Sequence, residues 1–198
     1  MKKFEEKKFN IGELKGISAK NIEEHLKLYA GYVKNANFIG EKLGELWVDG
    51  AEKNQYTASE LVRRFSFEYN GMRNHEIYFE SLSGGAKELN ESSPLRKKIT
   101  ENQGSFEIWL SIFKMLAMTR GIGWAIMWYD KKEDRLLNSW VDEQHLGQLQ
   151  GCTPILALDM WEHAFVADYQ PSGKKQYVED FFANLNWEVI EENFKKAL

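Results

Sequence analysis

Two kinds of hydrophobic pattern divide the chain. Up to about residue 81, apolar and aromatic residues recur every three or four positions among charged ones, which is the spacing of amphipathic helices. Beyond residue 120, apolar residues also gather in short continuous or alternating runs, which are typical of buried strands. The pattern therefore predicts a helical first half and a second half that mixes strands with helices.

The first helix is predicted to run from Ser18 to Asn37. Ser18 can serve as its N-cap, and Glu23 and Glu24 follow within the first turns, where the helix dipole favours acidic groups. His25 lies on this helix, and Tyr29 and Tyr32 follow it at i+4 and i+7. The three side chains therefore share one helical face.

Two further helices are expected in the first half. One is predicted to begin near Phe38, with the glycines at 40 and 44 marking either a close approach or a weak point, and the residues 48–50 are predicted to form a turn. A long helix over about 58–81 follows and is ended by Gly84 and Gly85. This long helix carries His75 among several aromatic residues.

A polar stretch over 88–95, with the run Ser-Ser-Pro, is the best candidate for a linker between domains. Two helical patterns follow as far as Gly121.

The runs 123–129 and 135–141 flank a polar turn and predict an antiparallel hairpin, and 154–158 supplies a third strand. The residues 174–185 and 187–196 predict closing helices, separated at Asn186.

The fold class is therefore predicted as α+β. We expect an N-terminal α-helical hairpin domain over 1–90 and a C-terminal α/β domain over 91–198. The second domain is expected to contain a small three-stranded antiparallel sheet flanked by helices.

Composition narrows the function classes. The 198 residues are 43% hydrophobic, which is ample for a core, and the formal net charge of −4 argues against nucleic acid or an anionic membrane as a partner. A single cysteine, Cys152, gives no sign of an oxidising compartment and is expected to be a small buried apolar residue. No run reaches the length of a membrane span, and the lysines near the N-terminus lack a following apolar segment. A cytoplasmic protein is expected.

Metal-ligand types cluster where the strand 154–158 ends. Asp159 follows the strand directly, and His163 comes four residues later, so a carboxylate and an imidazole can face one cavity. A strand followed by a capping Asp and an ordinary core His explains this spacing equally well. The longer string around Asp159 and His163 favours the metal-site interpretation.

The string DMWEHAFVADYQ, residues 159–170, closely resembles the DxWEHAYxxDYxN signature of the iron/manganese superoxide dismutase family. The similarity continues in FANLNW at 182–187 and in the stretch GSFEIWLSIFKMLAMTRGIGWAIMWYD at 104–130. ISAKNIEEH and YVKNAN resemble the family's first-helix pattern, and NHEIYF at 74–79 resembles its NHxxYW segment. The resemblance implies a superoxide dismutase that converts superoxide to dioxygen and hydrogen peroxide.

The resemblance also implies a ligand set. It assigns one iron or manganese ion per subunit to His25, His75, Asp159 and His163, and three nitrogens with one carboxylate oxygen suit either metal. Zinc shares these ligand types but offers no redox chemistry. The spacing from His25 to Tyr32 is seven residues, whereas the family pattern has eight, so Glu24 stays open as an alternative first ligand.

Further roles follow from the same resemblance. Tyr32 is expected to gate access and relay protons, and Trp161 to wall the site. His145, or else Gln144, is expected to be the outer-shell group that hydrogen-bonds solvent on the metal. Glu162 is expected to reach a ligand histidine of a second copy, which makes the protein a homodimer or a dimer of dimers.

Some positions differ from the family pattern, and another position varies among the family's members. Val166 stands where members often have a tyrosine that pairs with a first-helix histidine of the other subunit, and Tyr29 stands at that histidine's position. An altered proton path or dimer contact is therefore expected. Gly71 matches a position that is small in some members and glutamine in others, and a small residue there leaves room for a polar group from elsewhere.

Two other functions compete with dismutation. The shortened helix spacing and Val166 are compatible with a relative that binds metal but has lost or changed its activity. A helical interaction protein that keeps the fold without metal is the second alternative. Metal content, measured together with superoxide consumption, separates all three.

Overall fold

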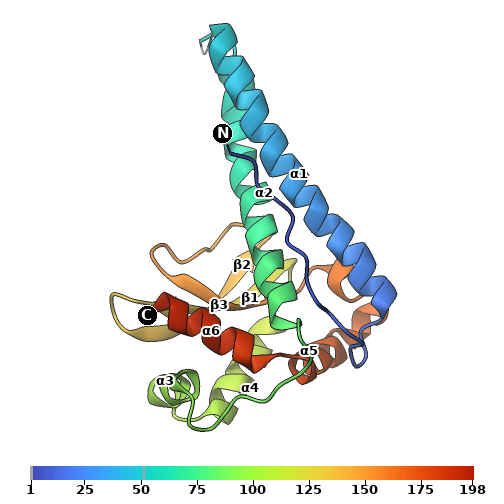
Figure 1. Ribbon diagram of the computed structural model, residues 1–198, viewed down its shortest axis with the longest axis vertical. Coiled ribbons are helices and arrows are strands. Elements are labelled where there is room, and N and C mark those ends of the chain that lie inside the picture. Colours follow the sequence, from blue (N-terminus) through green and yellow to red (C-terminus); the bar gives the residue numbers. More distant parts are fainter. Residues whose placement is uncertain (1, 51) are drawn as a thin grey trace.

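The computed structural model describes residues 2–50 and 52–198. It begins with an extended segment, residues 2–18, which we call the N-terminal strap, and then forms the elements shown in Figure 1. The helices are α1 (Ala19–Gly50), α2 (Gln55–Ser81), α3 (Pro94–Gln103), α4 (Phe106–Ala117), α5 (Lys174–Ala183) and α6 (Trp187–Ala197). The strands are β1 (Gly123–Asp130), β2 (Arg135–Asp142) and β3 (Thr153–Asp159), and two short 3-10 turns, η1 (Glu162–Ala164) and η2 (Pro171–Gly173), follow β3.

The first two helices form a long antiparallel hairpin, one end of which projects away from the rest of the molecule (Figure 1). Ser18 caps α1 as predicted, because its Oγ accepts a hydrogen bond from the backbone N–H of Asn21 at 3.1 Å. The predicted helix break near Phe38 is wrong, since α1 continues to Gly50 and includes the residues predicted to form a turn. Buried Ile39 and Leu43 face α2 across this region and offset the low helix propensity of the nearby glycines.

The three strands form one antiparallel sheet in the order β2-β1-β3. The central strand β1 is buried over 123–129 and is covered by helices, so it reads as a continuous apolar run. Its register places Trp124 opposite Asp159, the last residue of β3. The α+β class and the three-stranded antiparallel sheet are confirmed.

The C-terminal half packs onto the base of the hairpin. The helix α2 contacts β3 and α6, and residues of both halves share one hydrophobic core. Lys87 pairs with Asn186 in a short parallel bridge, which ties the residue just before the predicted linker to the break between α5 and α6. The division of the chain at residue 90 stays a prediction.

The N-terminal strap runs along the hairpin (Figure 1) and is fixed at several points. The backbone N–H of Phe4 donates to Asn37 on α1, and that of Lys15 donates to Asn184 at the end of α5. Across the described residues, no helix combines the length and apolar character that crossing a bilayer requires. Cys152 is only partly buried, packed against the core.

Candidate metal centre

Four side chains from separate parts of the chain converge at the base of the hairpin. His25 comes from α1, His75 from α2, Asp159 from the end of β3 and His163 from η1, and one ligand atom from each lies within 4.8 Å of the others. The side chains of His25, His75 and Asp159 are fully buried, whereas that of His163 is 21% exposed. Solvent therefore reaches the cluster on the side of His163.

Asp159 lies at the centre of the cluster. Its Oδ2 is 3.0 Å from Nε2 of His25, 3.1 Å from Nε2 of His163 and 3.6 Å from Nε2 of His75. Its Oδ1 accepts the backbone N–H of Trp161 at 2.8 Å, and the hydroxyl of Tyr177 donates to its carbonyl oxygen at 2.9 Å. These bonds fix the carboxylate so that one oxygen faces the three imidazoles.

The pKa values of the buried carboxylate and imidazoles are shifted by burial and by their neighbours. Burial by itself raises the pKa of Asp159, but the charge of His163 and the hydrogen bonds from His163 and His25 outweigh burial and lower that pKa overall. Burial lowers the pKa of His75 to about 3, with the neighbouring His25 adding to the effect, and burial likewise lowers the pKa of His25. The Asp159 carboxylate thus faces two buried imidazoles, those of His25 and His75, whose lowered pKa values favour the neutral form that metal ligation requires.

The hydrogen bonds of His75 leave one of its nitrogens available. Its Nδ1 lies 2.6 Å from the carbonyl oxygen of Gly71 and donates to it, because a carbonyl can only accept. This bond assigns the lone pair to Nε2, which is buried without a protein partner. A buried, unpaired acceptor beside a carboxylate and two further imidazoles fits a bound cation.

A chain of hydrogen bonds runs beside the ligands. The side-chain amide of Gln144 donates to the hydroxyl of Tyr32 at 2.9 Å, and its Oε1 accepts the indole N–H of Trp124 at 2.9 Å. Asn74 donates to the Gln144 carbonyl at 3.1 Å, so this fully buried glutamine is held at both its side chain and its backbone. The ring of Tyr32 lies 5.0 Å from that of His75.

The neighbouring His145 lies elsewhere. Its ring contacts Phe67 of α2 at 5.7 Å, and its Nδ1 has no hydrogen-bond partner. Glu143 adopts a φ of 51°, and its carbonyl accepts the indole N–H of Trp161. The structure therefore brings Gln144 to Tyr32, and not the His145 that the sequence favoured.

Comparison with known proteins agrees with this geometry. Residues 91–193 match the family described as iron/manganese superoxide dismutases, C-terminal domain. The chain is 36% identical over 189 residues to "Superoxide dismutase [Fe]" of Aquifex pyrophilus, with 93% of this chain and 87% of that protein covered. The chain belongs to the iron/manganese superoxide dismutase family.

Other members of the family carry either metal in their names. "Superoxide dismutase [Fe]" of Cupriavidus metallidurans is 35% identical, with 94% of this chain and 92% of that protein covered. "Superoxide dismutase [Mn]" of Mycolicibacterium fortuitum is 32% identical, with 96% and 90% covered. Family membership therefore implies iron or manganese without separating the two.

Glu24, the alternative first ligand, points away from the cluster. It is exposed and forms an ion pair with Lys27 at 2.9 Å, whereas His25 faces Asp159. A spacing of seven residues on a regular α-helix keeps both His25 and Tyr32 on the inner face. The one-residue difference from the family pattern is thus absorbed without moving the first histidine away from Asp159.

Trp161 and Glu162 flank His163. The Trp161 ring stacks on the imidazole at a centroid distance of 5.7 Å and an interplanar angle of 20°, so it forms a wall beside the exposed ligand. Glu162 is exposed and directly precedes His163 in η1. An exposed carboxylate beside a candidate ligand is accessible to another molecule.

The Tyr29 hydroxyl has its two partners on the strap and on α2, whereas Val166 follows η1. The hydroxyl accepts the backbone N–H of Lys7 at 2.9 Å and donates to Glu76 at 3.3 Å, so it belongs to the contact between the strap and α2. Val166 is 40% exposed. Within the chain, the bonds of Tyr29 join the strap to the hairpin beside the site.

Sequence reasoning missed the residues that hold Gln144. Trp124 and Asn74 occur in the family-like strings, but their sequence positions did not predict a contact with Gln144. Trp124 lies opposite Asp159 in the sheet, and Asn74 lies beside His75 on α2.

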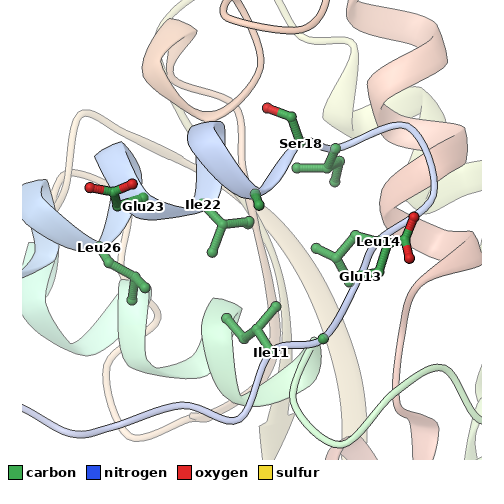
Figure 2. Close-up of a pocket in the computed structure, with 10 residues that line it drawn as sticks. Ile11, Glu13, Leu14, Ser18, Ile22, Glu23 and Leu26 are labelled. Atoms are coloured by element: carbon green, nitrogen blue, oxygen red, sulfur yellow. The ribbon is translucent and has the colours of Figure 1, made fainter.

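The structure also has a hollow of about 740 Å³ between the strap and the start of α1 (Figure 2). Its lining includes none of the four candidate ligands, so it is separate from the metal centre.

Proposed function

We propose that this protein is a superoxide dismutase that converts superoxide to dioxygen and hydrogen peroxide at one iron or manganese ion per subunit. The observation that carries the proposal is the convergence of three imidazoles and one carboxylate within 4.8 Å, buried except on the side of His163. Family membership agrees with this assignment. His25, His75, Asp159 and His163 would hold the ion, which would supply the one-electron oxidation and reduction that these side chains lack.

The protein's own contribution includes proton supply. Because the Tyr32 hydroxyl accepts from Gln144, its own O–H is free to donate toward the site. Burial raises the pKa of Tyr32, and the negative charges of Asp159 and Glu68 add to the effect, so the hydroxyl keeps its proton at neutral pH. We assign Tyr32 to gating and proton relay, with Gln144 positioning it and His145 outside this path.

Aromatic rings control access. The ring of Phe67 lies 6.0 Å from that of Tyr32 and 6.5 Å from that of Trp161, so the three rings line one side of the cluster. Such walls exclude bulk water and larger ligands, while a diatomic anion is small enough to approach beside His163. Trp161 is assigned to this wall.

Glu162 supports a homodimer. An exposed carboxylate next to a ligand histidine is suited to accept a hydrogen bond from the corresponding histidine of a second copy, which would fix that ring from outside. We propose a homodimer, or a dimer of dimers, as the functional state. A cytoplasmic location is proposed from the lone cysteine.

The test is metal analysis combined with a superoxide assay. Protein is produced in iron-replete and in manganese-replete cultures, and the metal content and the rate of superoxide consumption are measured on each preparation. Close to one ion per subunit with rapid dismutation is expected in at least one preparation. Stoichiometric iron or manganese without dismutation in either preparation would instead identify a metal-binding relative with altered activity.

A further inference from the structure

Gly71 lies in the middle of α2, where glycine is normally unfavourable. A glycine in a helix interior is less favourable than alanine because it gives up more backbone freedom on folding. The backbone of Gly71 is helical, and it is not among the glycines with positive φ. The reason for glycine at this position must therefore be the space that a side chain would occupy.

The ring of Tyr32 occupies that space. A Cβ built on Gly71 would lie 2.5 Å from Cδ1, 2.7 Å from Cε1 and 3.0 Å from Cγ of Tyr32. Distances this short are not tolerated between carbon atoms, so even one methyl group would displace the ring. The room expected for an incoming polar group is thus filled by the tyrosine itself.

The ring has little freedom to move within its plane. It packs 5.0 Å from His75 on one side and 6.0 Å from Phe67 on another, and its hydroxyl is tied to Gln144. Both packing partners lie on α2, one turn before and one turn after Gly71. A displaced ring must lift away from α2, which lengthens the hydrogen bond to Gln144.

We propose that Gly71 is a positioning residue for Tyr32: its missing side chain seats the ring on α2 within reach of Gln144. The carbonyl of the same residue accepts Nδ1–H of His75, so one helical position orients both a candidate ligand and the tyrosine. The packing claim stands on the distances alone. Its consequence for catalysis rests on the proposed function.

The decisive experiment compares Gly71→Ala in three backgrounds: the wild type, Tyr32→Phe and Tyr32→Ala. Gly44→Ala is the matched control, because Gly44 is also helical and a Cβ there meets nothing within 4 Å. Thermal unfolding midpoints of metal-loaded protein, metal content and superoxide consumption are measured for each. The phenylalanine background keeps the ring, and the alanine background removes it.

Gly44→Ala is expected to leave the unfolding midpoint unchanged or to raise it. Gly71→Ala is expected to lower the midpoint by at least about 3 °C in the wild-type and Tyr32→Phe backgrounds, but to behave like Gly44→Ala once Tyr32 is alanine. Superoxide consumption should fall at least about tenfold in Gly71→Ala while the metal content is kept. If the single variant does not fold, folding of the Gly71→Ala/Tyr32→Ala double variant supports the proposal, and its failure overturns it.

Two results would overturn the packing claim: a Gly71→Ala midpoint that matches Gly44→Ala in the wild type, or an equal loss in the Tyr32→Ala background. Full activity in a destabilised Gly71→Ala protein would overturn the catalytic consequence. A wild-type protein that binds metal without consuming superoxide would defeat the proposed function, whereas the thermal comparison would still decide the packing claim.

Discussion

The two ends of the helical hairpin are built differently. At its base, α1 and α2 pack against β3, η1 and the strap, and Tyr29, Val33, Met72 and Phe79 join the core shared by both halves of the chain. At the projecting end (Figure 1), Ile39, Leu43 and Ala58 form a small separate cluster. Large apolar side chains there lie open to solvent, including Val48 at 92% and Tyr56 at 83% exposure.

This difference predicts that substitutions at the projecting end change the stability of the hairpin, whereas substitutions at the base also change the metal centre. The four candidate ligands all lie at the base, where contacts from several elements fix each side chain. The projecting end depends mainly on contacts between the two helices, so changes there are expected to loosen the hairpin without moving the ligands. Substitutions that are matched in type but placed at opposite ends test this separation.

The largest effect is expected from Asp159→Asn at the base. The substitution removes the negative charge that faces three imidazoles, so bound iron or manganese should fall below about a tenth of the wild-type content, and superoxide consumption should fall at least about 100-fold. Elemental analysis and a superoxide assay provide the measurement. Asp49→Asn is the control at the far end, where the exposed Asp49 carboxylate pairs with Lys53 and Asn54, and it should change neither quantity.

Phe79→Ala should be the most destabilising of the apolar substitutions. The ring is fully buried and packs 4.9 Å from His25 and 6.1 Å from His75, so its loss is expected to cost about 3 to 5 kcal/mol in the free energy of unfolding. Metal should also dissociate faster, because both imidazoles lose support. Urea unfolding and the rate of metal transfer to a chelator measure the two effects, and an unchanged transfer rate would contradict the supporting role.

The sequence predicted the four candidate ligands because they lie in strings that resemble the family's motifs. Asp159 and His163 follow a short apolar strand, and His25 shares a helical face with Tyr32, so the local pattern agrees with the resemblance there. The hairpin strands 123–129 and 135–141 were likewise within one residue of their observed ends. These features depend on neighbours that are close along the chain.

Other features depend on contacts that no local pattern encodes. Helix α1 passes through glycines at 40 and 44 because α2 packs against it, so local weak points did not become a break. Gln144 and His145 are adjacent in sequence, and the contacts that hold Gln144 against Tyr32 come from Trp124 and Asn74, which are distant along the chain. A contact such as Gly71 against Tyr32 joins two helices and becomes visible only in three dimensions.

Leu43→Ala tests the far end of the hairpin directly. Leu43 is 7% exposed in the small cluster, so the truncation is expected to cost about 2 kcal/mol in unfolding free energy, near the lower end for buried leucines, because the site can relax toward solvent. Metal content and superoxide consumption should stay within about twofold of the wild type. Loss of metal in this variant would show that the two ends are coupled after all.

The smallest effect is expected from Tyr29→Phe, which probes the back of the metal centre. The lost hydroxyl bonds to the Lys7 backbone and Glu76 should cost about 1 kcal/mol in unfolding free energy, and activity should stay within about twofold because the hydroxyl does not face the ligands. A tenfold loss of activity would show instead that Tyr29 belongs to the proton path.

The pH dependence of the same variant sharpens this test. Burial, assisted by the charge of Glu76, raises the pKa of Tyr29 from its usual value of 10.0 to about 12. A folded-state pKa above the unfolded value means that the protonated hydroxyl stabilises the fold fully below pH 10 and that this contribution is lost as the pH rises toward 12. Urea unfolding at pH 9 and pH 11 should therefore show a smaller alkaline loss of stability in Tyr29→Phe than in the wild type, and equal losses would contradict the buried position of the hydroxyl.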